Sequence, residues 1–153
     1  MPRAGFYAIQ ASQIRFARDG CWYADGERIT NSRIADLFSR HVQRGGDGRY
    51  VIRMGDEQAV IEVEDTPFVV VASAVDAAGE IVVELNDHTS ERIDPATLVV
   101  GQDQVLYCRV KGGTERARFL RPAYYQLARH ITEAEPGRFV VRVGTAVHPI
   151  ARG

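Results

Sequence analysis

Cys108 is the residue in this chain whose neighbours could activate it for chemistry. It lies in the segment 105–111, beside Arg109 and close to Lys111, and nearby cations lower the pKa of a thiol and favour the nucleophilic thiolate. On an alternating strand, however, Cys108 faces away from Arg109, and a cysteine in such a place is more often a small buried hydrophobic residue. A thiol-dependent enzyme or redox sensor using Cys108 therefore stands as one alternative and a buried structural cysteine as the other.

Four arginines recur at matching places in two strand-like segments: Arg49, Arg53, Arg138 and Arg142. Guanidinium groups bind carboxylates and phosphates well, so these arginines could form an anion site. If the hairpin that contains Arg49 is extended from its turn, Arg49 instead falls opposite Glu62, where a plain cross-strand ion pair would form. The residue pattern leaves both interpretations open.

Metal and phosphate-loop chemistry find no support in the spacing of the candidate ligands. Cys21 and Cys108 are the two cysteines, and neither lies in a Cys-x-x-Cys or Cys/His pattern. The carboxylates of segment 62–65 and the polar groups of segment 87–90 lack a partner at a specific spacing. We therefore expect no metal site and no cofactor.

Two amphipathic helices must position these groups. The first is predicted from Thr30 or Asn31 as N-cap to a stop at Gly45, and the second begins at Pro122, which suits the first helical position. Each carries apolar residues at helical spacing: Ile34, Leu37, Phe38, His41 and Val42 in the first, and Tyr124, Leu127, Ala128 and Ile131 in the second.

Strands occupy most of the remaining chain. Asp-Gly and Gly-Asp turns favour hairpins, and the run from Phe68 to Val75 is apolar on both faces, as in a central strand. The polar stretch 87–96 is predicted to be a loop between two halves. Further strands are expected at 13–18, 21–24, 49–54, 57–64, 80–86, 97–100, 104–111, 114–119, 138–143 and 145–150.

The chain repeats itself after 89 positions. This shift aligns segment 40–42 with 129–131 and segment 48–55 with 137–144, including turn glycines and strand arginines. We infer an α+β protein made of two repeated β-hairpin, helix, β-hairpin units, with mostly antiparallel sheets around a shared core. The expected units are 1–86 and 97–153, joined by the loop 87–96.

Composition restricts the partners. The 153 residues carry 19 basic and 20 acidic side chains in a mixed pattern, which gives no footprint for nucleic acid. No apolar run has the roughly 20 residues that a membrane helix requires, and residues 1–9 lack the apolar core of a secretory signal. We expect a cytoplasmic protein.

Several segments together resemble the bacterial family known as domain of unknown function 1285. They are Arg18–Tyr23, the Leu37-Phe38 helix, Asp47–Tyr50, Val63–Phe68 and the stretch from Ala117 to Leu127. The resemblance spans nearly the whole chain, and it implies a duplicated α+β core whose C-terminal half looks superficially like a pleckstrin-homology fold. It also implies a link to signalling and a site between the halves.

From these features we expect a regulatory module, rather than an enzyme, that holds a small ligand or a partner segment in a groove between its halves. The candidate binding residues are Trp22, Asp65, Arg118, Arg121 and Tyr124.

Overall fold

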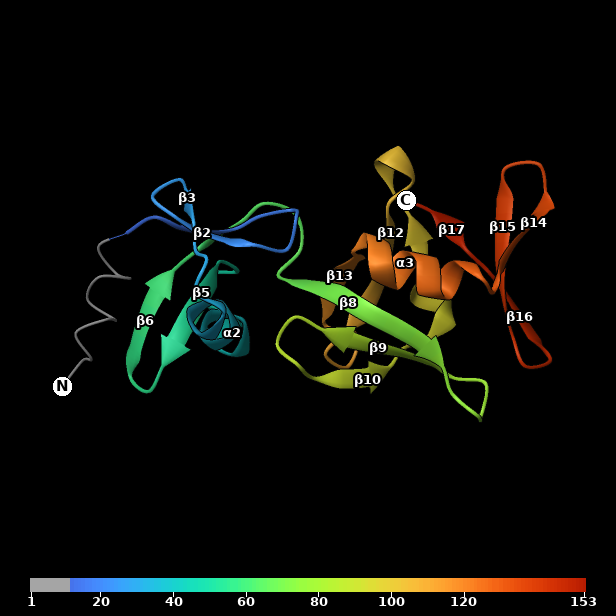
Figure 1. Ribbon diagram of the computed structural model, residues 1–153, viewed down its shortest axis with the longest axis horizontal. Coiled ribbons are helices and arrows are strands. Elements are labelled where there is room, and N and C mark those ends of the chain that lie inside the picture. The colour runs from blue at the N-terminus through green and yellow to red at the C-terminus, as the bar shows by residue number, and fades with distance from the viewer. Residues whose placement is uncertain (1–11) are drawn as a thin grey trace. The chain divides into compact units, whose positions relative to one another are not determined.

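A computed structural model describes residues 12–153, which fall into two compact units that meet in sequence at Pro67 and Phe68. Each unit is described by itself, and the shared core stays a prediction. The reading of residues 1–9 as lacking a secretory signal lies outside the described residues. The fold is mixed α+β, with two α-helices in the described part and strands in mostly antiparallel sheets (Figure 1).

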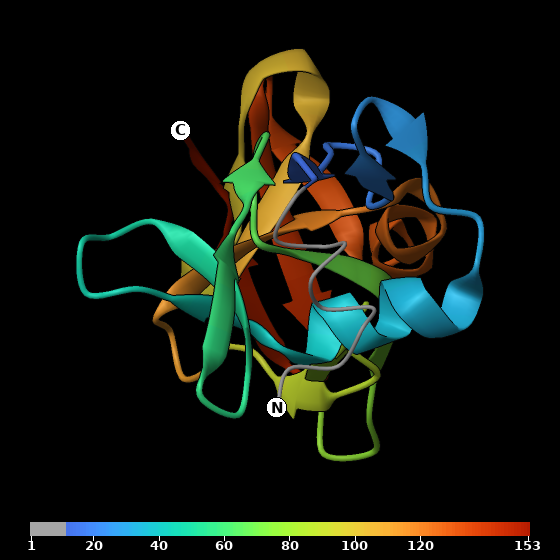
Figure 2. The ribbon, with the colours of Figure 1, turned by 90° about the vertical axis from the view of Figure 1, so that its left-hand side faces the viewer.

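The N-terminal unit contains a four-stranded sheet, one helix and a three-stranded sheet (Figure 2). The sheets have the strand orders β3-β2-β1-β7 and β4-β5-β6, and the β1–β7 pair is parallel. The elements are β1 (Ile14–Phe16), β2 (Trp22–Ala24), β3 (Glu27–Arg28), α2 (Ser32–Arg40), β4 (Val42–Arg44), β5 (Tyr50–Met54), β6 (Glu57–Val60) and β7 (Glu62–Val63).

The C-terminal unit contains a seven-stranded sheet, one helix and a second three-stranded sheet, with orders β10-β9-β8-β13-β12-β11-β17 and β14-β15-β16. Its elements are β8 (Phe68–Val75), β9 (Ile81–Leu85), β10 (Ser90–Arg92), the 3₁₀ turns η1 (Pro95–Thr97) and η2 (Gln102–Gln104), β11 (Val99–Val100), β12 (Leu106–Val110), β13 (Glu115–Phe119), α3 (Arg121–Ala128), β14 (Ile131–Glu135), β15 (Arg138–Val143), β16 (Ala146–Pro149) and β17 (Ala151–Arg152). As predicted, β8 is a central strand, between β9 and β13.

The two units share one order of elements, in which α2 and β4 to β7 correspond to α3 and β14 to β17. Val42 pairs with Ile52 in one sheet, and Ile131 pairs with Val141 in the other, 89 positions later. The strands before each helix also correspond, with a shift of 84 positions: Phe16 pairs with Trp22 as Val100 pairs with Leu106. The duplication therefore extends from β1 to β7 and from β11 to β17.

Strands β8, β9 and β10 have no counterpart in the described residues 12–67 of the N-terminal unit. β8 pairs with β13 in parallel orientation and with β9 in antiparallel orientation. The three strands therefore extend the sheet of the C-terminal copy. The division of the chain thus lies earlier than the boundary at 87–96 that the sequence suggests, and that polar stretch itself contains β10. The difference arises because β8 forms its hydrogen bonds with a strand far along the chain.

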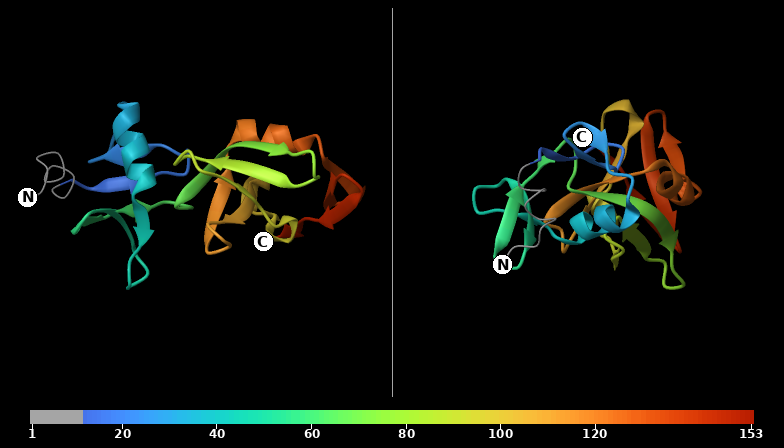
Figure 3. Two further views of the ribbon diagram at one scale, coloured as in Figure 1. Left: turned by 90° about the horizontal axis from the view of Figure 1, so that it is seen from below. Right: turned by 60° about the vertical axis from the view of Figure 1, so that its left-hand side comes forward.

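The first helix begins where expected, and the second begins at Arg121, one residue before the expected Pro122. The side chain of Asn31 accepts hydrogen bonds from the amides of Arg33 and Ile34 at 3.0 and 3.3 Å, and α3 has a proline in its first turn. The first helix ends at Arg40, earlier than the predicted stop at Gly45, and the chain enters β4 directly (Figure 3). His41 caps it by donating its amide to the carbonyl of Phe38 at 3.1 Å.

The predicted pairing of Arg49 with Glu62 is wrong. Glu62 belongs to β7 and pairs with Arg15 of β1, because the chain changes sheets after β6. Arg49 instead forms an ion pair with Asp47 at 2.7 Å.

Candidate functional site: a pocket in the C-terminal unit

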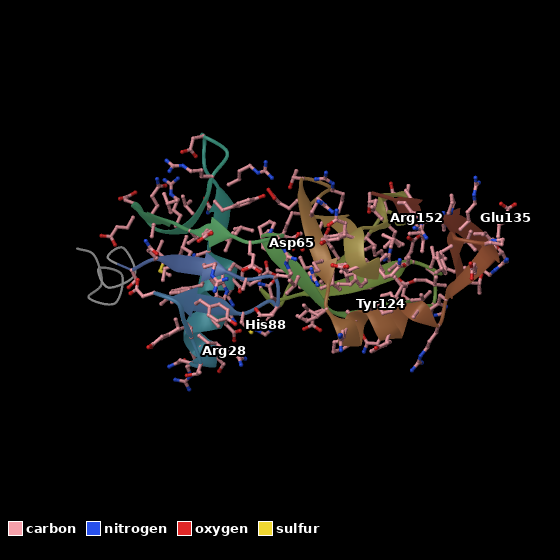
Figure 4. The ribbon with its side chains drawn as sticks, turned by 90° about the horizontal axis from the view of Figure 1, so that it is seen from above. Arg28, Asp65, His88, Tyr124, Glu135 and Arg152 are labelled. Carbon is pink, nitrogen blue, oxygen red and sulfur yellow. The ribbon has the colours of Figure 1, made fainter. Side chains whose placement is uncertain are left out.

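A pocket of about 170 Å³ opens between α3, the β11–β12 hairpin and the sheet β14-β15-β16. Figure 4 marks Tyr124 on the helix. Most of the wall is apolar, and the polar members are Gln104, Glu133 and the hydroxyl of Tyr124. The lining residues are Val100, Gln104, Leu106, Tyr124, Ala128, Ile131, Glu133, Phe139 and Ile150.

The N-terminal unit fills the equivalent space with aromatic rings. Trp22 is only 2% exposed; its ring lies 4.8 Å from that of Phe16 and 5.5 Å from that of Phe38. The indole Nε1 donates to the Ser39 hydroxyl at 2.9 Å. This cluster closes the core between the four-stranded sheet and α2.

The corresponding positions in the C-terminal unit carry smaller side chains. By the strand registers Val100 stands where Phe16 does and Leu106 where Trp22 does, and Ala128 stands where Ser39 does in the helix. Tyr124 replaces a smaller residue, Ala35, and its ring forms one wall of the pocket. The pocket is therefore the core site of one copy left open in the other.

The loop that contributes Gln104 to the pocket has strained backbone. Asp103 and Gln104 are consecutive non-glycine residues with φ of 58° and 60°, a conformation that such residues adopt at some energetic cost. A Cβ at Gly101 would lie 2.9 Å from the Tyr107 ring, so the loop has no room for a larger residue there. Residues held in this way are over-represented at ligand sites.

Of the predicted binding residues, Trp22 and Asp65 belong to the N-terminal unit. Trp22 is a core residue whose polar atom is satisfied within its own unit. Asp65 is half-buried in the turn after β7 (Figure 4). The expected site between the halves stays a prediction.

The other three predicted residues belong to the C-terminal unit. Arg118 lies on β13, where it pairs with Tyr107 and Val69 in the sheet, and Arg121 is exposed at the start of α3. Only Tyr124 lines the pocket. The signal that could have found the other lining residues was the alignment of Trp22 with Leu106, which the shift of 89 positions hides.

Cys108 is 1% exposed on β12. Burial, with a smaller effect of the Glu91 carboxylate, raises the pKa of the Cys108 thiol to about 12. The neighbouring Lys111 ammonium is bound to Asp87 at 2.5 Å. These observations favour the buried structural cysteine over the reactive thiol. The Cys21 thiol also has a raised pKa, through partial burial and the Asp19 carboxylate.

Asp87 and Lys111 form a polar cluster that fixes the turn after β9 to the end of β12. Burial alone would raise the pKa of Asp87, but hydrogen bonds from Lys111 and Thr89 outweigh it, and the pKa lies below its ordinary value. Lys111 also lies 4.8 Å from the centre of the Phe68 ring. Because these groups satisfy one another, the cluster is structural.

Within residues 12–153 no group of histidine, cysteine and carboxylate side chains is placed to hold a metal ion. Neither helix of that range has the length and apolar character needed to cross a membrane.

Part of the chain matches a known protein family. The family model "Domain of unknown function (DUF1285), N-terminal domain" matches residues 7–66, which agrees with the division at Pro67. No curated protein matches.

Two solved structures share the fold. A DUF1285 family protein from Silicibacter pomeroyi DSS-3 is 24% identical, with a TM-score of 0.71 over 91% of this chain and 79% of that one. A DUF1285 family protein from Shewanella baltica OS155 is 19% identical, with a TM-score of 0.61 over 78% of this chain and 93% of that one. The N-terminal unit thus matches the N-terminal domain of the DUF1285 family, and the chain shares its fold with two structures of that family.

Proposed function

We propose that this protein is a binding module whose C-terminal unit holds a small, mainly apolar ligand group between α3 and the β11–β12 hairpin. The observation that carries the proposal is the replacement of Phe16 and Trp22 in one copy by Val100 and Leu106 in the other. Unfilled apolar space costs stability in a close-packed protein. An open core site is therefore better explained by an occupant than by packing.

The size and chemistry of the pocket restrict that occupant. A dry apolar cavity of about 150 Å³ holds a benzene molecule, so 170 Å³ suits one aromatic ring or one branched side chain of a partner segment. Gln104, Glu133 and Tyr124 would meet a polar end of the ligand. One Glu133 oxygen already accepts the amide of Gly137 at 2.7 Å, which orients that carboxylate.

Binding without chemistry suits a regulatory role, in line with the link to signalling that the family resemblance implies. The burial of the Cys108 thiol argues against the alternative, a thiol enzyme or redox sensor that uses this residue. The likeness of the C-terminal half to a pleckstrin-homology fold stays a prediction.

Indole is the probe for the first experiment, because an indole ring fills the equivalent space in the N-terminal unit. Methyl NMR during an indole titration should shift the signals of Leu106, Ile131 and Ile150. Leu106→Trp should fill the pocket and weaken indole binding at least tenfold. Tyr125→Trp adds the same ring one residue from Tyr124 at a site that is 63% exposed, and should change the affinity less than twofold.

Two results would refute the assignment. One is an absence of methyl shifts in the wild-type protein at millimolar indole. The other is equal binding by the wild-type and the Leu106→Trp protein, provided that both give native amide spectra.

A further inference from the structure

A second hollow lies in the N-terminal unit, on the face of the sheet β4-β5-β6 that carries Val51, Arg53 and Gln58. It measures about 360 Å³ and is lined mainly by polar side chains and by the glycine loop between β4 and β5. Val51 and Val60 form an apolar floor. Val60 is 51% exposed. We call this hollow the arginine groove.

Positive charge predominates in the arginine groove. Three arginines and one carboxylate line it: Arg44, Arg49, Arg53 and Asp47. Their formal charges sum to +2. A phosphate monoester carries a charge of about −2 near pH 7 and would neutralise this excess.

The arginines are held in place by contacts within their own unit, and those of Arg53 leave donors for a ligand. Arg53 donates Nε to the carbonyl of Gly55 at 3.3 Å, which orients the group and leaves its terminal nitrogens. In the described part of the chain Arg53 forms no ion pair. Arg49 is held by Asp47 at 2.7 Å, and Arg44 lies 5.1 Å from the centre of the Tyr50 ring. Guanidinium groups fixed in this way lose little entropy when they bind an oxyanion.

The duplication supplies an internal comparison. At the shift of 89 positions Arg49 and Arg53 have arginines as counterparts, but Arg44 becomes Glu133 and Gly46 becomes Glu135. The C-terminal face therefore carries equal numbers of positive and negative groups. One of the added carboxylates, Glu135, lies 3.8 Å from Arg138, the counterpart of Arg49. Since both copies have the same strand order here, the excess positive charge is a property of this face and not a requirement of the fold.

We propose that the arginine groove binds a small molecule that carries a phosphate group, with the phosphate at Arg53 and the rest of the molecule over Val60. The proposal concerns the N-terminal unit and does not depend on the pocket beside Tyr124. A hydroxyl-bearing carbon chain suits the groove because Gln43 and Gln58 stand beside the valine floor.

Glycerol 2-phosphate is the probe, titrated at constant ionic strength into the full-length protein labelled for amide NMR. The expected result is saturable shifts of amides between residues 43 and 60, with a dissociation constant in the millimolar range or below. Glycerol at the same concentrations should leave these amides unchanged, and sodium chloride should produce no saturable shift.

The matched pair of variants is Arg53→Gln and Arg142→Gln, which remove equivalent arginines from the two copies. Arg53→Gln should raise the dissociation constant at least fivefold, and Arg142→Gln should change it less than twofold. Arg53→Lys keeps the positive charge but not the planar guanidinium group that can donate two parallel hydrogen bonds, and should give an intermediate loss of affinity.

Equal losses in Arg53→Gln and Arg142→Gln would overturn the proposal, because they would indicate general charge attraction. Shifts that follow ionic strength alone, or shifts mapped to the C-terminal unit, would overturn it as well. Both variants change exposed side chains, so native amide spectra are expected and a failure to bind is not a failure to fold.

Discussion

Trp22 is both the largest buried side chain of the N-terminal unit and the residue whose absence opens the C-terminal one. Its ring contacts Phe16 and Phe38, and its one polar atom is paired with Ser39. The same backbone position is thus a packing anchor in one copy and a pocket wall in the other. A single substitution should therefore convert one state into the other.

Trp22→Leu should lower the free energy of unfolding by about 3 kcal/mol, because the truncated side chain leaves a cavity in a packed core. Urea unfolding followed by far-UV circular dichroism measures this loss. Trp22→Phe, which keeps much of the ring, should cost less. A loss for Trp22→Leu no larger than that of the exposed control Tyr125→Phe would contradict the assignment of Trp22 to the core.

Cys108 makes a prediction about alkaline pH. Its folded pKa of about 12 lies above the ordinary value of 9.0, so unfolding releases a proton between these two values. The stabilisation is complete below about pH 9 and is lost as the pH rises toward 12, with a slope of about 1.4 kcal/mol per pH unit. Urea unfolding between pH 8 and 11 should show this slope in the wild type but not in Cys108→Ala. Parallel pH profiles would show that the thiol is already exposed.

Asp87 and Lys111 connect two elements that are distant in sequence, the turn after β9 and the end of β12. The Asp87 side chain is 7% exposed and that of Lys111 is 30% exposed. Breaking such a pair leaves the remaining group desolvated. We expect Asp87→Asn to destabilise the protein by about 2 kcal/mol in urea unfolding at pH 7.

The pH dependence distinguishes the ion pair from simple packing. Because the folded pKa of Asp87 is depressed, its stabilisation is present above the ordinary carboxyl pKa and is lost as the pH falls through the folded value. The difference between Asp87→Asn and the wild type should therefore shrink on acidification from pH 5. A difference that stays constant down to pH 2 would contradict the ion pair.

The helices and long strands follow from local sequence. Asn31 supplies the cap that its residue type favours, and the turn at Asp19-Gly20 joins β1 to β2 as predicted. The two-residue strands β3 and β17 were missed, and β7 was predicted only as the continuation of β6, because two residues are too few to show a local pattern and the pairing with β2, β11 or β1 defines each strand. The first helix was predicted too long for a similar reason. His41 and Val42 continue the apolar stripe of the helix in sequence, but Val42 pairs with Ile52 in a sheet.

At the scale of the whole chain, the sequence revealed the repeat only where equivalent residues are separated by a constant number of positions. From the helix onward one shift aligns everything, whereas the β2–β3 hairpin pairs Tyr23 with Arg28 and the longer β12–β13 hairpin pairs Tyr107 with Arg118. That change in hairpin length hid the counterpart of Trp22, and with it the pocket. Of the candidate site, the sequence therefore identified Tyr124 alone.

Among the described residues the strands β8 to β10 occur in the C-terminal copy alone, so the two copies have different sheet edges. In the C-terminal unit β13 hydrogen-bonds to β8, whereas its counterpart β3 is an edge strand of its sheet within residues 12–153. An open margin invites pairing with a strand of another molecule. β3 is two residues long, and both of them, Glu27 and Arg28, are exposed and charged. The N-terminal unit thus limits aggregation at this edge through a short, charged strand, whereas the C-terminal unit covers the equivalent edge with β8.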